Sequence, residues 1–143
     1  MASAPALIVD AGVLYAGVDR ADPDHAAAAA LLQGWPGELV VSAFVAAEAD
    51  YLVLTRLGVE AELRLLDDLA DVYFVESLDP GGLRIARDVC ARYADLELGL
   101  ADASVVVLAA NWATSAVATL DERDFRAVTG LDGEPLRLLP ADG

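Results

Sequence analysis

The sequence predicts an α/β protein in which helices cover both faces of a short, mainly parallel β-sheet. Apolar residues make up 57% of the 143 residues, which is enough for a substantial core. Short apolar runs of strand length alternate with longer segments of helical periodicity. Alternation of this kind is typical of parallel sheets, so we expect three layers, α/β/α. The length fits one domain that spans residues 1–143.

Each element has a local justification, beginning at the N-terminus. The first strand is expected at residues 7–9, followed at once by a short helix that includes Tyr15. Pro23, with an acid on either side, marks the first turn of a second helix, because acids and Pro are favoured there. Gly34 ends that helix. A second strand is expected at residues 39–41.

The middle of the chain predicts two successive helices and a strand. Ser42 is a suitable N-cap for a helix that ends at Leu57, where Gly58 provides the C-terminal signal. A further helix is expected at residues 59–70 and a strand at residues 72–75.

The last third repeats the alternation. Pro80, preceded by an acid, opens a helix that reaches Tyr93. We then expect a helix at residues 100–112, a strand at residues 116–120 and a final strand at residues 136–139. Binding sites in such folds form beyond the carboxyl ends of the strands.

The charge of the chain restricts its partners. The formal net charge is −15, from 24 acidic residues and nine basic ones, all of them arginine. Such a chain does not attract nucleic acid through its overall field, although it suits a basic protein partner. The single cysteine, Cys90, excludes an internal disulfide and a cysteine-based zinc site. No leader peptide and no membrane-spanning run is visible, so we expect a soluble, cytoplasmic protein.

Four acids lie where their neighbours predict a buried surface or the end of a buried strand: Asp10, Glu48, Asp102 and Asp121. A buried carboxylate is costly unless a positive group meets it, and converging carboxylates need protons or a cation. Oxygen ligands select hard divalent cations such as Mg²⁺ or Mn²⁺. The four placements together indicate a metal-dependent phosphodiesterase that acts through metal-activated water.

Each acid also has an ordinary structural explanation. On its expected helix Glu48 shares a face with apolar residues, but so does Asp50, and periodicity does not separate them. Asp102 lies in a first helical turn, where the helix dipole favours an acid. Asp10 could cap the helix that follows it, and Asp121 could belong to an acidic turn. The functional interpretation therefore depends on the agreement of all four.

Other enzyme classes that gather acids at strand ends fit less well. We expect receiver domains and haloacid-dehalogenase-like phosphatases to use an active-site lysine, and this chain has none. Asp10 is followed by Ala11 and Gly12, so the Asp-x-Asp motif of the second class is missing. The only histidine, His25, stands at a helix start and is interpreted as a solvated residue, which argues against serine–histidine chemistry.

Beyond these physical arguments, the chain resembles the PIN domain, and within it the VapC-type toxins of bacterial toxin–antitoxin pairs. The resemblance covers nearly the full length, and its ordered set of motifs is fairly specific. Four segments carry it: residues 7–16 (LIVDAGVLYA), 40–52 (VVSAFVAAEADYL), 93–104 (YADLELGLADAS) and 118–128 (ATLDERDFRAV).

This resemblance implies a PIN fold, Mg²⁺ or Mn²⁺ dependence, endoribonuclease activity and a small VapB-type antitoxin that occupies the active-site groove. By motif position, Asp10, Glu48, Asp102 and Asp121 form the catalytic acidic site. Asp10, Asp102 and Asp121 would hold the metal, with Glu48 as a ligand or as a residue that orients one.

Several further residues are candidates. Asp124 matches a variably acidic position, Asp95 is common in closely similar sequences, and Thr119 and Ser104 are small polar residues that could orient ligands or water. Two arginines flank the last acidic turn and are the candidates for RNA phosphate contacts: Arg123 and Arg126.

The i, i+4 spacing of Arg84, Asp88 and Arg92 instead predicts ordinary pairing on a helix surface. The high apolar content predicts an exposed hydrophobic patch and hence a homodimer. The RNA substrate is open between transfer RNA and ribosomal RNA. The competing hypothesis is a non-catalytic PIN scaffold that binds a basic protein or RNA without cutting it.

Overall fold

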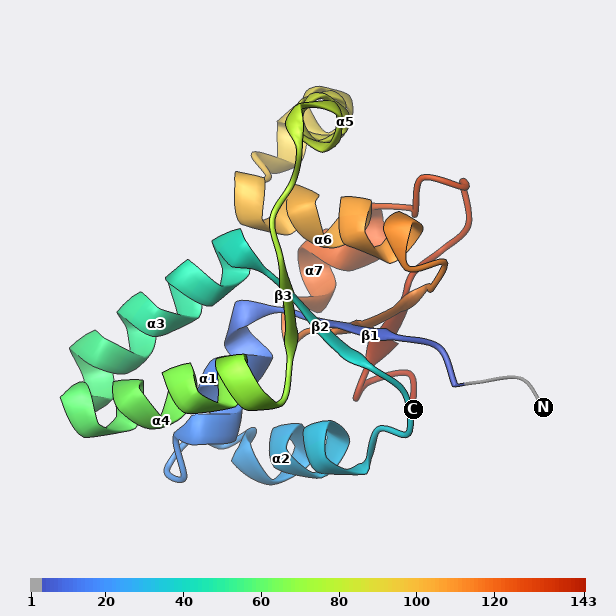
Figure 1. Cartoon of the computed structure of the whole chain (residues 1–143). Helices are drawn as coiled ribbons and strands as arrows, with labels where there is room; N and C mark the ends of the chain where they lie inside the picture. Colours follow the sequence, from blue (N-terminus) through green and yellow to red (C-terminus); the bar gives the residue numbers. More distant parts are fainter. Residues whose placement is uncertain (1–3) are drawn as a thin grey trace.

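The computed structural model describes residues 4–143, and its centre is a five-stranded sheet with the order β3-β2-β1-β4-β5 (Figure 1). Every neighbouring pair is parallel. The strands are β1 (Leu7–Val9), β2 (Leu39–Ser42), β3 (Phe74–Glu76), β4 (Ala116–Ala118) and β5 (Arg137–Leu139). The expected parallel sheet is therefore confirmed.

Seven α-helices and one 3-10 helix, η1, occur within the described residues. They are α1 (Ala11–Val18), α2 (His25–Gly34), α3 (Ala43–Leu57), α4 (Val59–Asp71), α5 (Pro80–Arg92), η1 (Ala94–Leu96), α6 (Leu100–Asn111) and α7 (Glu122–Ala127). In Figure 1, α1, α2 and α4 lie below the sheet, whereas α6 lies above it with α5 on top of α6. The expected α/β/α layering is confirmed.

The two central strands position the site. Leu7, Ile8 and Val9 of β1 are fully buried. The next residue, Asp10, donates its backbone N–H to the carbonyl of Ala118 at 2.9 Å, so the carboxyl ends of β1 and β4 are adjacent. Above them, α6 is apolar around most of its circumference, as expected for a helix enclosed between the sheet and α5.

The helix boundaries expected from local signals are close to those observed. Ser42 caps α3 by accepting hydrogen bonds from the backbone N–H groups of Phe44 and Val45. Gly58, at φ 93°, ends α3 in the left-handed region that glycine tolerates. Asp79 caps α5 through the N–H of Gly82 at 2.7 Å.

Two expectations need correction. The strand expected at residues 72–75 begins at Phe74, because Val72 keeps a helical backbone as the C-cap of α4. The strand expected at residues 116–120 ends at Ala118, and the acidic segment that follows forms a short helix, α7, which was not expected. Among the residues that the structure describes, none of the helices combines the length and apolar character needed to cross a bilayer.

Candidate metal-binding carboxylate site

Asp10 is the most buried acid of the described chain, with 8% of its surface exposed. It follows β1 and caps α1, with Oδ1 accepting the backbone N–H of Ala11 at 2.9 Å. Oδ2 accepts the hydroxyl of Thr119 at 3.0 Å. Burial raises the pKa of Asp10, and the nearby Asp121 carboxylate adds to the rise. The two hydrogen bonds oppose that rise and fix the carboxylate in one orientation.

Thr119 joins two of the acids. Its fully buried side chain lies just beyond β4, where the hydroxyl donates to Asp10 and accepts the backbone N–H of Asp121 at 2.9 Å. Asp121 in turn caps α7 through the N–H of Asp124 at 3.2 Å. One hydroxyl therefore sets both the orientation of Asp10 and the path of the backbone toward Asp121.

Asp102 lies in the first turn of α6, half-buried and facing the other acids. Burial, followed by the charges of the neighbouring carboxylates, raises the pKa of Asp102 to about 6. The contributing neighbours, from the strongest to the weakest, are Asp10, Asp121, Glu48 and Asp124. Because four other carboxylates raise the pKa of Asp102, it belongs to a cluster of acids that face one another.

The structure separates Glu48 from Asp50. The Glu48 side chain is exposed on α3, where partial burial of its carboxyl group and the charge of Asp10 raise its pKa. Asp50 instead faces α4, and a hydrogen bond with it raises the pKa of Glu62. Oδ1 of Asp50 is buried without a partner among the described residues. Glu48 therefore belongs to the cluster, and Asp50 to the contact between two helices.

The four acids expected from the sequence line one open cavity of about 360 Å³, together with Ala11, Gly12 and Leu120. No arginine of residues 4–143 lines this cavity, so no cationic side chain among its described lining residues offsets its negative charge. Hard oxygen donors without a counter-charge are the ligand set that suits a divalent cation. We call these four residues and their cavity the carboxylate pocket.

The acids do not yet surround a single point. In the described part of the chain, no three acidic, histidine or cysteine residues stand close enough together to hold a metal ion as they are. Carboxylates without a cation repel one another. Glu48 and Asp121 are exposed, so rotamer changes could bring their oxygens inward. The donor chemistry therefore fits a cation, with side-chain adjustment on binding.

The remaining candidates differ in their distance from the pocket. Asp124 is close enough to raise the pKa of Asp102. Ser104 is fully buried in α6 and donates to the hydroxyl of Ser42 at 2.6 Å, which ties α6 to the N-cap of the helix that carries Glu48. Asp95 is exposed in η1 and is not among the residues that line the pocket. The link between Ser104 and Ser42 had no local signal, because the two residues are 62 positions apart.

The two candidate arginines also differ. Arg123 is exposed on α7 and makes no ion pair with any described residue. Arg126 pairs with Glu122 at 2.9 Å and with Asp142, and these two carboxylates raise its pKa. Arg126 therefore has an internal role at the C-terminal end of the fold, and it could meet a phosphate only by leaving these partners.

Comparison with known proteins identifies the family of the chain. The family model of the PIN domain matches residues 7–131, so the chain belongs to the PIN domain family. It is similar to a protein of Mycobacterium tuberculosis named Ribonuclease VapC26, with 38% identity over 135 residues, which is 94% of this chain and 100% of that protein.

Solved structures show the same fold at lower identity. One is Mycobacterium tuberculosis VapC20, described as a sarcin-ricin loop cleaving toxin, with a TM-score of 0.75, 20% identity and coverage of 82% of this chain and 91% of that one. Another is a toxin–antitoxin complex from Klebsiella pneumoniae, with a TM-score of 0.68, 17% identity and coverage of 87% and 93%. The fold expected from the sequence is therefore the fold of known toxins.

Proposed function

We propose that this chain is a metal-dependent endoribonuclease and the toxin of a VapBC-type toxin–antitoxin pair. The observation that carries the proposal is the carboxylate pocket, where four acids meet without a cation from the described chain. The relative with 38% identity, aligned over its whole length, is named a ribonuclease, and this supports RNA as the substrate. Hydrolysis by metal-activated water uses such a ligand set and needs no covalent nucleophile.

In this proposal Asp10, Asp102 and Asp121 hold Mg²⁺ or Mn²⁺, with Glu48 as a further ligand or as the residue that orients one. A bound cation would supply Lewis acidity and lower the pKa of a water molecule beside the phosphodiester. Thr119 keeps Asp10 in a fixed orientation. Burial and then the charges of the neighbouring carboxylates raise the pKa of Asp102 to about 6, and a cation would neutralise those charges.

The partners follow from charge and exposed surface. A net charge of −15 suits a basic antitoxin, and a solved structure with the same fold is a toxin–antitoxin complex. A homodimer is supported by exposed apolar side chains on α3 and α4, among them Tyr51 (66% exposed), Val59 (58%) and Leu63 (54%). The similar fold of a sarcin-ricin loop cleaving toxin makes ribosomal RNA a substrate to test beside transfer RNA.

The test is cleavage of total bacterial RNA by the purified chain without an antitoxin. Discrete fragments are expected with Mg²⁺ or Mn²⁺, and they should disappear with EDTA and with Asp10→Asn. The matched control is Asp50→Asn, which removes the same charge outside the pocket and should still cleave. If the folded chain produces no fragments with either metal, the non-catalytic PIN scaffold replaces the nuclease.

A further inference from the structure

One helix departs from the acidic character of the chain. The 13 residues of α5 carry three arginines, Arg84, Arg87 and Arg92, and a single acid, Asp88. All other residues together contain six arginines and 23 acids. The local charge of α5 is therefore positive in a protein whose net charge is −15. We call the three arginines the α5 ridge.

The α5 ridge is largely free of internal partners. The predicted i, i+4 pairing of Arg84, Asp88 and Arg92 is wrong, because Asp88 pairs with the adjacent Arg87 at 3.1 Å. Within residues 4–143, Arg84 and Arg92 make no ion pair. Arg92 lies over the ring of Tyr93, 5.6 Å from its centroid. Two guanidinium groups are thus available to an external anion.

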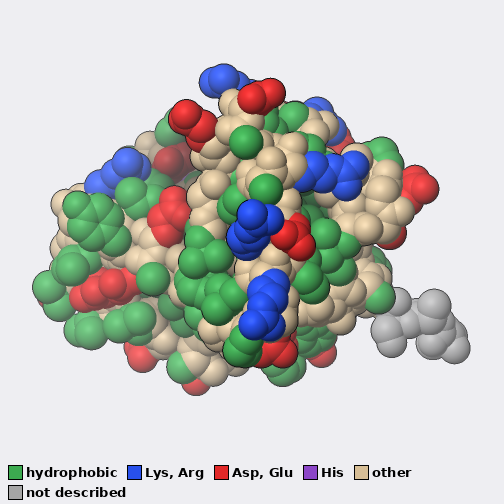
Figure 2. All heavy atoms as spheres, turned by 90° about the horizontal axis from the view of Figure 1, so that it is seen from above, with side chains coloured by type: hydrophobic (Ala, Val, Ile, Leu, Met, Phe, Trp, Pro, Cys, Tyr) green, Lys and Arg blue, Asp and Glu red, His purple; other side chains and the backbone are tan. Residues whose placement is uncertain are grey.

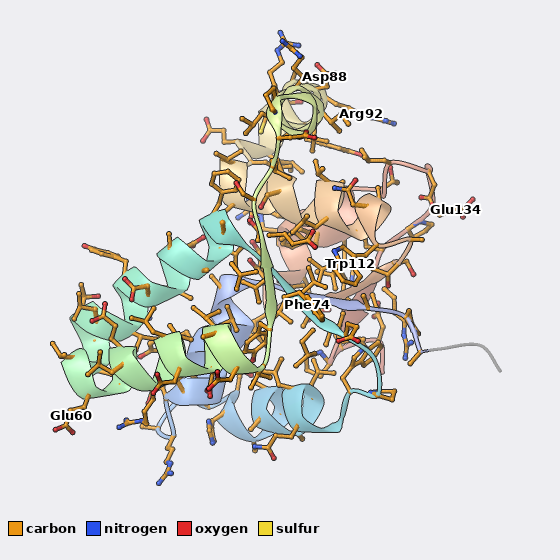
Figure 3. All side chains as sticks on the ribbon, in the orientation of Figure 1. Glu60, Phe74, Asp88, Arg92, Trp112 and Glu134 are labelled. Atoms are coloured by element: carbon orange, nitrogen blue, oxygen red, sulfur yellow. The ribbon has the colours of Figure 1, made fainter. Side chains whose placement is uncertain are left out.

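The ridge faces away from the protein core. Ala86 and Val89 are the buried residues of α5, and the helix packs on α6, which lies between it and the sheet (Figure 1). Figure 3 shows Asp88 and Arg92 directed outward from α5. In the view from above, basic side chains run along the middle of the face that α5 forms (Figure 2).

The C-terminal end of α5 lies near the start of α6, the helix that carries Asp102. A surface hollow joins Ile85, in the first half of α5, to Asn111 at the end of α6. Near the other end of α5, the Cys90 thiol contacts the carbonyl of Leu98, just before α6, at 3.6 Å. The first half of α5 therefore lies near the end of α6, and Arg92, the last residue of α5, lies nearer the start of α6, whose first turn carries Asp102.

A second contact holds this end in place. The Tyr93 hydroxyl accepts the backbone N–H of Thr129 at 3.1 Å. Thr129 closely follows α7, the helix whose first turn carries the exposed Arg123. The end of α5 is thereby fixed relative to the segment that Asp121 caps.

We propose that the α5 ridge binds the phosphate backbone of the RNA substrate and leads the strand to the carboxylate pocket. This inference rests on the proposed ribonuclease function. A polyanion is repelled by the net negative charge of the rest of the chain, so a row of cations on the helix that packs on α6 is its favoured approach. Arginine binds phosphate with two parallel hydrogen bonds. Arg84 and Arg92 are about 12 Å apart along the helix axis, so one extended strand can contact both side chains.

Two double variants with the same net charge test the proposal. Arg84→Gln with Arg92→Gln removes the unpaired cations of the ridge. Arg64→Gln with Arg137→Gln removes two cations elsewhere and serves as the control. Glutamine keeps much of the apolar stem and a high helix propensity. Binding of a fluorescent single-stranded RNA of mixed sequence is measured by anisotropy in EDTA, where no metal-dependent cleavage occurs, over a range of salt concentrations.

The ridge variant is expected to bind RNA about 25-fold more weakly than the unmodified chain at 0.1 M salt, with a salt slope smaller by about 1.4. The control should change little. Equal losses in both variants, no loss in the ridge variant, or no RNA binding by the unmodified chain would each overturn the proposal. A changed elution volume of the ridge variant with unchanged RNA binding would also overturn it and assign the ridge to a contact between copies.

Cleavage assays with Mg²⁺ separate this inference from the proposed function. If the ridge guides RNA, its loss raises KM and leaves kcat nearly unchanged. Cleavage with the same KM in the ridge variant would support the nuclease function and contradict RNA binding by the ridge. RNA binding that depends on the ridge, without any cleavage, would support the role of the ridge and contradict the nuclease function.

Discussion

Two acids on the same helix, α3, belong to two different groups of carboxylates. Glu48 lines the carboxylate pocket, where Asp10 is already fixed by two hydrogen bonds. Asp50, two residues later, faces Glu62 across the contact between α3 and α4, and one of its oxygens is buried without a partner among the described residues. Both groups bring carboxylates together, and in both the neighbouring charge raises a pKa.

The difference lies in what each group can accept. The carboxylate pocket is open, and the Ala11 N–H and the Thr119 hydroxyl hold the Asp10 carboxylate in place. A cation can therefore enter and relieve the repulsion between the carboxylates. Asp50 and Glu62 lie together at the contact between α3 and α4, where protonation of Glu62 is the simplest relief of the repulsion. Acid density alone therefore does not define a metal site; access and ordered hydrogen bonds do.

The largest expected effect separates the two groups by activity. Asp102→Asn removes a charge from the pocket and should lower RNA cleavage with Mg²⁺ about 100-fold or more, since a lost ligand weakens the metal and its chemistry. Asp50→Asn removes the same charge outside it and should cleave at nearly the normal rate. Initial rates on one RNA substrate measure both. Equal losses would contradict the distinction.

A second effect tests the hydrogen bond that the Thr119 hydroxyl donates to Asp10. Thr119→Val keeps the shape but leaves the carboxylate of Asp10 and the N–H of Asp121 without their shared partner. The free energy of unfolding should fall by about 2 kcal/mol, as for a buried hydrogen bond to a charged group. Urea unfolding in EDTA measures it. Thr55→Val, whose hydroxyl binds its own helix backbone at 2.8 Å, is the control and should change little.

The third effect is a dependence of stability on pH. Because the folded pKa of Asp102 is raised from 3.8 to about 6, the folded state binds more protons than the unfolded state between these values. Stability without metal should therefore fall as pH rises through this window. We expect the chain in EDTA to be about 1 kcal/mol more stable at pH 5 than at pH 7, after allowance for solvent screening of a half-exposed group.

Urea unfolding at both pH values checks this expectation, and Asp102→Asn should lose part of the difference. Asp10 and Glu48 also have raised pKa values and act in the same direction. Mg²⁺ should stabilise the unmodified chain more at pH 7 than at pH 5, because protons compete with it for the same oxygens. A chain more stable at pH 7 than at pH 5 in EDTA would refute the assignment.

The smallest effect concerns the helix contact. Glu62→Gln removes the like-charge repulsion with Asp50 and keeps a donor for the hydrogen bond between them. The thermal midpoint should rise slightly at pH 7 and less at pH 4, where Glu62 is protonated in the unmodified chain. A lower midpoint at pH 7 would indicate that the ionised pair is held by contacts other than those described.

Much of this protein follows from local sequence signals. The apolar runs indicate the five strands, and Ser42 and Asp79 act within three positions of themselves, so the starts of α3 and α5 could be predicted. Acids that closely follow buried strands lie at the carboxyl edge of a parallel sheet; Asp10 directly follows β1, and Asp121 comes three residues after β4. The PIN motifs strengthened the same choice.

Only the tertiary structure decided the rest. Helical periodicity gives Glu48 and Asp50 equivalent apolar neighbours, and the packing of α4 against α3 alone assigns them to different surroundings. The hydrogen bond from Thr119 to Asp10 joins residues 109 positions apart. Arg84 and Arg92 have no ion pair with Asp88 because Asp88 pairs with Arg87 instead. Periodicity fixes the direction in which a side chain points, whereas its partner is fixed by the element packed opposite, which a local pattern does not contain.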